Sequence, residues 1–216
     1  MKQPVIVIGS GGHAKVVIEI LHALNNYTII GVTSNSLHKG DLFAGYNVLG
    51  EDSVLIEYNP HKHLIAMGLG GYKNNILREK VYSYVKKMGF NFVNVIHPQA
   101  ILSESTKLGE GVVIFPGVVI NSEVIIGDNT IIATGSTIDH ETAIGNHVLV
   151  SAGVTIGAYS KLHDNSLIAL GAKVISGIDI GKNAVVAAGA VVISNVSENE
   201  TVYGIPALPK KKKDAE

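Results

Sequence analysis

A histidine and a glutamate stand side by side at His140 and Glu141, between runs of short aliphatic residues. A carboxylate beside an imidazole raises its pKa from an ordinary value of about 6.5, which favours a general base. His140 is the third residue of the six-residue unit 138–143, and we expect it at a corner that points outward. A solvated corner without a catalytic role is the alternative that the spacing leaves open.

A glycine-rich turn, Gly9 to Ala14, follows the hydrophobic run Pro4 to Ile8. It fits the G-x-G-x-x-A form, in which backbone N–H groups and a helix N-terminus approach a phosphate. A dinucleotide site also needs an acidic residue about twenty positions further on, but Ser34 and Asn35 stand there and no acid appears before Asp41. The pattern favours a nucleotide sugar or another phosphorylated ligand over NAD. A turn that merely joins strand to helix is the alternative.

A second glycine-rich stretch, residues 68–75, also follows a hydrophobic run and opens a helical pattern. In a parallel sheet, both turns lie at the carboxyl edge, where ligands bind. We therefore expect the two turns to contribute to one ligand site.

The elements that position these turns alternate between strands and helices. We expect strands at 4–8, 27–32, 63–67 and 92–96, which together form a small α/β unit with a parallel sheet. A helix at 13–24 would carry an apolar side formed by Val16, Val17, Ile20, Leu21 and Leu24. A helix between the last two strands would carry Ile76, Leu77, Val81, Tyr84, Val85 and Met88.

The second half of the chain repeats every six residues. Sixteen consecutive positions at this spacing, from Leu102 to Val192, are all Leu, Ile or Val, and a small or β-branched residue follows four places after each. A helix of about 3.6 residues per turn cannot keep such a stripe on one face. Short strands wound as a parallel solenoid can, with the first residue of each hexad pointing inward. An ordinary β-sandwich is the weaker alternative.

Composition separates the two halves near His97 and Pro98. Residues 1–97 hold nine Lys and Arg against six Asp and Glu, whereas residues 98–216 hold eight against twelve. We expect a domain boundary there, between an α/β domain at 1–97 and a β-helix at 98–200, followed by a turn with a basic tail at 201–216.

The overall composition excludes several classes of protein. The 216 residues carry a net charge of −1, which argues against general nucleic-acid binding. The apolar runs are far shorter than the roughly 18 residues that span a bilayer, and the N-terminus shows no signal-peptide pattern. We expect a soluble, cytoplasmic protein without a membrane span.

Metal and thiol chemistry find little support in the sequence. His61 and His63 could ligate a metal from one strand, but no third ligand accompanies them. The absence of cysteine excludes disulfides, thiolate metal sites and a cysteine nucleophile. We therefore expect no metal site.

Four segments together resemble a known family. They are the run 5–17 (VIVIGSGGHAKVV), the hexad array, the segment 138–141 (IDHE) and the ending 202–207 (VYGIPA). In this order they resemble the sialic acid O-acetyltransferase family of hexapeptide-repeat acyltransferases, which includes bacterial UDP-4-amino-sugar N-acetyltransferases. The resemblance covers nearly the whole chain.

The resemblance implies a left-handed β-helix of about five coils, a homotrimer, and acetyl-CoA bound between adjacent prisms. His140 would be the general base in a direct transfer, and Glu141 the carboxylate that makes it more basic. The nucleotide-sugar region would comprise Ser10, Gly11, Gly12, His13, Lys15, Ser34, Asn35, Gly70 and Gly71. The acetyl-CoA region would comprise Leu149, Leu170, Gly171, Ala188, Gly189, Gly204 and Pro206. The lysines 210–213 would either contact CoA phosphates or form a solvated tail.

Two positions depart from the family pattern. Relatives often carry two aspartates where this chain has Ser34 and Asn35, which leaves the nucleotide and the sugar open. Relatives also often carry a second histidine where this chain has Leu149, and His147 occupies a different corner position.

Three functions therefore compete. The first is acetyl-CoA-dependent N-acetylation of a nucleotide-linked amino sugar, with a UDP-4-amino-4,6-dideoxy sugar as the expected acceptor. The second is O-acetylation of a sialic-acid-like sugar, which needs a stronger base than an amine does. The third is a non-catalytic, trimeric nucleotide-sugar-binding protein.

Overall fold

The computed structural model describes residues 2–71 and 75–210. The chain divides into two compact units, one made of residues 1–98 with 110–113 and the other of residues 99–109 with 114–216. The functional division at residues 97 and 200 stays a prediction. Among the described residues, no helix is long and apolar enough to cross a membrane.

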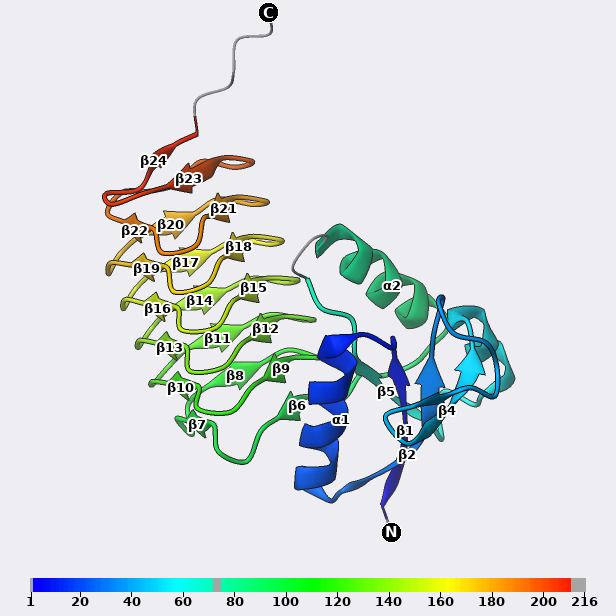
Figure 1. Cartoon of the computed structure of the whole chain (residues 1–216). Helices are drawn as coiled ribbons and strands as arrows, with labels where there is room; N and C mark the ends of the chain where they lie inside the picture. The colour runs from blue at the N-terminus through cyan, green and yellow to red at the C-terminus, as the bar shows by residue number, and fades with distance from the viewer. Residues whose placement is uncertain (1, 72–74, 211–216) are drawn as a thin grey trace, which may run out of the picture. The chain divides into compact units, whose positions relative to one another are not determined.

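The first unit is built on a five-stranded sheet with the order β3-β4-β2-β1-β5. The strands are β1 (Gln3–Ile8), β2 (Tyr27–Thr33), β3 (Leu42–Phe43), β4 (Tyr46–Gly50) and β5 (Leu64–Met67). All neighbours are parallel except β3 and β4. Helices α1 (Gly12–Leu24) and α2 (Asn75–Lys87) and the 3-10 helix η1 (Asp52–Glu57) complete the unit (Figure 1).

The predicted strands are confirmed at β1, β2 and β5, but the expected strand at 92–96 is wrong in part. Phe92 forms only a single bridge with Ile65, and the short strand β6 (Val95–Ile96) lies outside the five-stranded sheet. The elements β3, β4 and η1 were not expected, because this stretch carries no long apolar period.

The helix α2 is confirmed, but its expected apolar side is wrong in part. Its buried residues are Arg78, Tyr82 and Val85. Ile76 and Leu77 are 56% and 50% exposed. Leu77, one of these exposed residues, lines a pocket that is described below.

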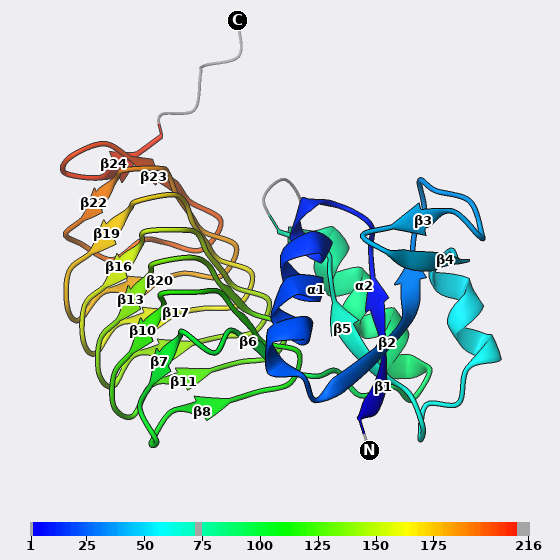
Figure 2. The same ribbon diagram turned by 60° about the horizontal axis from the view of Figure 1, so that its bottom comes forward.

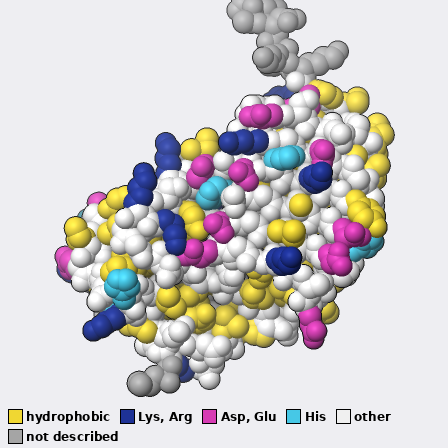
Figure 3. Space-filling view, turned by 180° about the vertical axis from the view of Figure 1, so that it is seen from behind, with side chains coloured by type: hydrophobic (Ala, Val, Ile, Leu, Met, Phe, Trp, Pro, Cys, Tyr) yellow, Lys and Arg dark blue, Asp and Glu magenta, His cyan; other side chains and the backbone are white. Residues whose placement is uncertain are grey.

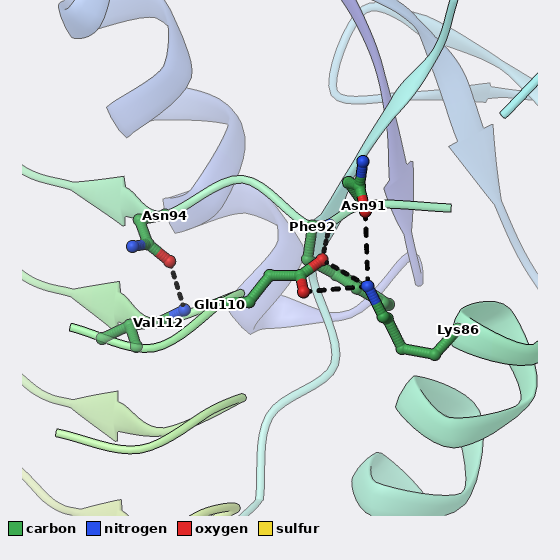
Figure 4. Close-up of polar contacts among 6 residues, drawn as sticks. All are labelled: Lys86, Asn91, Phe92, Asn94, Glu110 and Val112. Atoms are coloured by element: carbon green, nitrogen blue, oxygen red, sulfur yellow. Dashed lines mark hydrogen bonds and ion pairs between the residues drawn. The ribbon is translucent and has the colours of Figure 1, made fainter. Parts of the chain in front are cut away.

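The segment 110–113 is fastened to the first unit by polar contacts (Figure 4). The Lys86 ammonium lies 2.8 Å from a Glu110 carboxylate oxygen, and the other oxygen accepts the Phe92 N–H at 2.5 Å. The Asn94 side-chain oxygen accepts the Val112 N–H at 2.9 Å. Because both charged side chains are about one-third exposed, we attribute most of the fixation to the hydrogen bonds.

The second unit is a parallel β-helix of two-residue strands, whose coils stack one on another (Figures 1 and 2). One sheet holds β7 (Ile101–Leu102), β10 (Val119–Ile120), β13 (Thr137–Ile138), β16 (Thr155–Ile156), β19 (Lys173–Val174) and β22 (Val191–Val192). A second holds β8 (Lys107–Leu108), β11 (Ile125–Ile126), β14 (Ala143–Ile144), β17 (Lys161–Leu162) and β20 (Asp179–Ile180). The third continues through β9 (Val113–Ile114), β12 (Ile131–Ile132), β15 (Leu149–Val150), β18 (Leu167–Ile168) and β21 (Val185–Val186).

The six-residue period is confirmed as the repeat of this β-helix. The hexad-opening residues from Ile114 to Val192 are at most 3% exposed, and they form the core together with the small residues four places later. Buried hydroxyls are satisfied by the coils themselves. For example, the Thr130 hydroxyl donates to the Gly145 carbonyl and the Ser136 hydroxyl to the Ser151 carbonyl.

The C-terminal end of the described chain closes this unit. Strand β23 (Thr201–Tyr203) pairs in parallel with β21, and β24 (Leu208–Pro209) pairs in antiparallel with β23. The turn at 204–206 joins the two strands. Of the basic tail, Lys210 is the only described lysine, and 211–213 lie outside the described residues.

Candidate functional site

Each coil of the β-helix turns three corners, and the fourth residue of nearly every hexad adopts a left-handed backbone there. The first corner carries Gly117, Gly135, Gly153, Gly171 and Gly189, and we call it the glycine corner. The second carries Glu123, Glu141, Tyr159 and Gly177, and we call it the His140 corner. The third carries Asn129, His147, Asn165 and Asn183, and we call it the asparagine corner.

His140 lies at the corner that follows β13, as its place in the hexad predicts. Its Nδ1 lies 3.1 Å from a carboxylate oxygen of Glu141. The two side chains are 40% and 44% exposed, so both are open to a ligand at the surface. The left-handed backbone of Glu141, with φ of 56°, directs its side chain back toward the preceding residue.

The backbone of His140 is fixed by the aspartate before it. The Asp139 carboxylate accepts the His140 N–H at 2.8 Å and the Asn121 side-chain N–H at 2.9 Å. The Asn121 hydrogen bond, followed by the His140 N–H, lowers the pKa of Asp139 below its ordinary value. Asp139 therefore stays ionised and holds the corner, while Glu141 is left to serve the imidazole.

Tyr159 is a member of this cluster that the sequence did not predict. Its ring stands edge-on to the His140 ring, with centroids 5.0 Å apart and an angle of 88°. A hydrogen bond to the Glu141 carboxylate raises the pKa of the Tyr159 phenol, because it stabilises the protonated form. The signal that could have revealed Tyr159 is its position one coil after Glu141.

Four of the expected acetyl-CoA residues gather at the glycine corner. They are Leu170, Gly171, Ala188 and Gly189, in two successive coils. No atom lies within 4 Å of the place where a Cβ would stand at Gly135, Gly171 or Gly189. This corner therefore presents an open backbone edge, with Leu170 58% exposed beside it.

The other expected acetyl-CoA residues lie elsewhere in the β-helix. Leu149 belongs to β15, and Gly204 and Pro206 belong to the turn between β23 and β24. The Val191 N–H donates to the Gly204 carbonyl at 3.0 Å, which anchors that turn to the last full coil.

The structure does not bring the glycine corner and the His140 corner together within one chain. The first lies between the sheets of β15 and β13, and the second between those of β13 and β14. His147 is at the third corner, where its Nδ1 lies 2.9 Å from the Asn129 side-chain nitrogen. His147 is therefore not placed to assist His140 in the same chain.

The glycine turn of the first unit borders a pocket of about 300 Å³. Among the expected nucleotide-sugar residues, Ser10, Gly11, Ser34 and Asn35 line it. Leu69, Leu77 and Val81 supply apolar lining, so two of the apolar residues on α2 face this pocket. The two glycine-rich turns thus contribute to one site through Gly11 and Leu69.

A serine cluster occupies the end of β2. The Ser10 and Ser34 hydroxyl oxygens lie 2.6 Å apart. The Ser34 oxygen also accepts the Ser36 and Leu37 N–H groups at 3.1 and 2.9 Å. Ser34 therefore shapes the loop, and Asn35 is the exposed polar side chain beside it.

The pocket does contain a carboxylate, which comes from a different element. Asp52, at the start of η1, lines the pocket and accepts the Thr33 hydroxyl at 2.5 Å. An acid was expected directly after β2, whereas Asp52 lies nearly twenty residues beyond the end of β2, after β4. A search for acids that flank β4, the neighbour of β2 in the sheet, could have found it.

The remaining expected residues lie around the turn but do not line this pocket. No atom lies within 4 Å of the Cβ position at Gly12, and a Cβ at Gly70 would meet the His13 Cβ at 3.4 Å. The Lys15 ammonium lies 6.0 Å from the Phe43 ring centroid, and Gly71 is buried. Residues 72–74 of the second turn lie outside the described residues.

His13 is largely shielded from solvent and does not line the pocket. Burial, and then the charge of Arg78, lower the pKa of His13 to about 3. Burial also lowers the pKa of Arg78 to about 9, and its guanidinium donates to the Leu69 carbonyl. Arg78 therefore ties the second glycine-rich stretch to α2 through Leu69.

Within residues 2–71 and 75–210, no group of three His, Asp or Glu side chains could hold a metal ion. The His63 Nδ1 lies 3.1 Å from the Asn59 carbonyl oxygen, and the His63 ring packs on Tyr58. Charged side chains of both signs are interspersed over the face in Figure 3.

Known families match both units. The PglD N-terminal domain matches residues 4–85, and the bacterial transferase hexapeptide repeat matches residues 105–140. The hexapeptide repeat of succinyl-transferase matches residues 123–158 and 164–194.

Two solved structures are similar over nearly the whole chain. PerB from Caulobacter crescentus, in complex with CoA and GDP-perosamine, is 33% identical, with a TM-score of 0.89 over 96% of this chain and 97% of that one. The acetyltransferase domain of PglB from Neisseria gonorrhoeae, in complex with acetyl coenzyme A, is 28% identical, with a TM-score of 0.89 over 97% of this chain and all of that one.

A curated relative matches a smaller part of the chain. The UDP-N-acetylbacillosamine N-acetyltransferase of Bacillus subtilis is 31% identical over 116 residues. The match spans 51% of this chain and about half the length of that relative.

The fold and the repeats define a left-handed β-helix acyltransferase with an α/β domain before it. The chain belongs to the sialic acid O-acetyltransferase family of hexapeptide-repeat acyltransferases, and it carries the N-terminal domain of the PglD type. The family expected from the four sequence segments is confirmed.

Proposed function

We propose that this protein transfers the acetyl group of acetyl-CoA to the amine of a nucleotide-linked sugar, with a UDP-4-amino-4,6-dideoxy sugar as the first candidate. The observation that carries the proposal is the His140–Glu141 pair at an outward corner of a hexapeptide-repeat β-helix. The pocket at the glycine turn offers a place for the nucleotide. Similarity to an enzyme solved with CoA and a nucleotide sugar supports the same reaction.

In this mechanism His140 is the general base. Glu141 accepts the Nδ1–H of the imidazole, which leaves Nε2 to take a proton from the sugar amine. The amine nitrogen forms a bond to the thioester carbonyl carbon, the carbon–sulfur bond breaks, and the sulfur receives the proton as CoA leaves. A backbone N–H is the simplest donor to the oxyanion. No covalent enzyme intermediate is needed.

The glycine corner is the proposed place for acetyl-CoA. An extended, flexible ligand can lie along stacked coils only where no side chains intervene, and Gly135, Gly171 and Gly189 leave that edge open. Leu170 and Ala188 would give apolar contacts beside it, and the turn at Gly204 and Pro206 would border its C-terminal end.

The separation of the two corners favours a site built by two chains. We propose a homotrimer in which the His140 corner of one chain faces the glycine corner of its neighbour, as closed symmetric assembly allows. His140 and Glu141 of one chain would then act on the thioester held by the other.

The nucleotide would bind in the pocket of the first unit. Backbone N–H groups at Ser10 and Gly11 and the start of α1, which has no side-chain cap, suit a phosphate. Asp52 is placed to accept hydrogen bonds from ribose hydroxyls, and Asn35 from the base. The apolar side chains of Leu69 and Leu77 would cover the ring faces.

A GDP-linked amino sugar is a second candidate acceptor, because PerB was solved with GDP-perosamine. Free sialic acid is the acceptor for the O-acetyltransferase alternative. A non-catalytic binding protein would acetylate none of these three acceptors, which are the UDP-linked amino sugar, the GDP-linked amino sugar and free sialic acid.

The experiment is acetyl-CoA-dependent release of free thiol with each acceptor, and mass spectrometry of the product. Turnover with a UDP- or GDP-linked amino sugar, and an acetyl group on the amine nitrogen, is the expected result. Turnover with sialic acid alone would establish O-acetylation instead. Nucleotide-sugar binding without turnover of any acceptor would contradict the catalytic proposal.

A further inference from the structure

Tyr159 stands one coil after Glu141 on the His140 corner. The period of 18 residues places Glu123, Glu141 and Tyr159 in one column, and the Tyr159 N–H donates to the His140 carbonyl at 3.1 Å. The stack of the coils therefore brings the tyrosine over the His140–Glu141 pair.

The backbone of Tyr159 is unusual for a bulky residue. Its φ is 60°, in the left-handed region that glycine and asparagine occupy at most of the other corners. A side chain with a Cβ is strained in this conformation. Asn165, in the same hexad position one corner later, shows the more usual choice. The cost points to a role for the ring itself.

The ring and the hydroxyl of Tyr159 make two separate contacts. The ring edge packs against the imidazole of His140 at 5.0 Å between centroids. The Glu141 carboxylate raises the pKa of the Tyr159 phenol, so it favours the protonated hydroxyl as a donor. The same carboxylate lies 3.1 Å from His140 Nδ1, so Glu141 interacts with both the imidazole and the phenol.

The other charged groups at this corner do not compete for those donors. Asp139 is engaged by the His140 backbone and by Asn121. Glu123 lies one coil before Glu141 and acts on the phenol only through its charge. Glu141 is therefore the carboxylate that the imidazole and the phenol share.

We propose that Tyr159 is a positioning residue, whose hydroxyl fixes the Glu141 carboxylate and whose ring fixes the imidazole of His140. Together they keep Nδ1 against Glu141 and direct Nε2 outward as the base. This role rests on the proposed function, in which Nε2 takes the proton of the acceptor. Tyr159 itself need not touch the substrate.

The first test separates the hydroxyl from the ring. Tyr159→Phe keeps the ring and loses the hydrogen bond, and we expect kcat to fall about fivefold with KM for both substrates unchanged. Tyr159→Ala loses both contacts and should lose at least tenfold more. Tyr46→Phe is the matched control, because it removes a hydroxyl that bonds another histidine, His22, at 2.5 Å in the first unit.

A double-mutant cycle tests whether the effect passes through Glu141. In a Glu141→Ala background the hydroxyl has no carboxylate to hold, so Tyr159→Phe should cost nothing further. The same fivefold loss in both backgrounds would overturn the proposal.

The second readout does not depend on activity. The ¹⁵N shifts of the His140 ring in the free protein report which nitrogen carries the proton. We expect the Nδ1–H form to dominate in the wild type and in Tyr46→Phe, and to fall in Tyr159→Ala. An unchanged tautomer in Tyr159→Ala would overturn the positioning role. A changed tautomer in a protein that acetylates nothing would leave that role intact and reject only the proposed function.

Discussion

At the scale of single residues, the chemistry depends on the hexad position that each side chain occupies. His140 at the third position points outward, and Glu141 at the left-handed fourth position turns back toward it. These two neighbours could be predicted from sequence, because their contact is local. Tyr159 could not, because its contact exists only once the coils stack. Asp52 was missed for a similar reason, because only folding brings the start of η1 to the pocket at the glycine turn.

A pH dependence of stability follows from His13. Because its pKa is about 3 in the folded state and about 6.5 when unfolded, only the unfolded state gains a proton as the pH falls below 6.5. Stability is therefore retained above pH 6.5 and lost as the pH falls toward 3. We expect His13 to account for a loss of about 1–2 kcal/mol between pH 7.5 and 5.

The measurement is urea unfolding at the two pH values, followed by the helical circular dichroism signal. Both described helices belong to the first unit, so this signal reports on the unit that contains His13. His13→Gln removes the titration and should lose less stability between the two pH values than the wild type. Equal losses in the two proteins would contradict the assignment.

At the scale of elements, the β-helix was the most predictable part of the fold. A six-residue stripe of buried aliphatics specifies strand, turn and face together, and the coils from Ile114 to Val192 follow it. The α/β unit was less predictable. Strand β3 has only two residues, and Phe92 pairs through a single bridge, so neither carries a periodic signal. One apolar side was expected on α2, whereas Leu77 and Val81 line the pocket at the glycine turn.

The proposed binding of acetyl-CoA at the glycine corner can be tested by a substitution. A leucine at Gly171 would place a side chain on the open edge proposed for acetyl-CoA, where no atom now lies within 4 Å of the Cβ position. We expect Gly171→Leu to raise KM for acetyl-CoA at least tenfold and to leave KM for the nucleotide sugar unchanged. The readout is steady-state kinetics with each substrate varied in turn.

The control for backbone strain is Asn183→Leu. Asn183 has φ of 56° but lies on the asparagine corner, where we propose no ligand. This variant should bear a similar conformational cost, roughly 1 kcal/mol, and keep the KM for acetyl-CoA. A tenfold rise in both variants would show that strain, not the corner, is responsible.

At the scale of the whole molecule, one chain holds the two halves of the proposed site on different corners. This arrangement predicts complementation between two inactive chains, His140→Ala and Gly171→Trp. In a random equal mixture, about a quarter of the sites would combine an intact His140 with an intact glycine corner from the neighbour. We expect activity to recover to about a quarter of the wild-type value after the two chains are expressed together. No recovery in verified mixed oligomers would place the site within one chain.

The central claim is that His140 removes the proton from the sugar amine. Its most direct test is the rate of thiol release from acetyl-CoA by His140→Ala, with the acceptor that the wild type uses. His163→Ala is the matched control, because His163 is an exposed histidine on another part of the same β-helix. We predict a loss of at least a hundredfold in kcat for His140→Ala, and wild-type rates for His163→Ala. Undiminished turnover by a folded His140→Ala protein would contradict the mechanism.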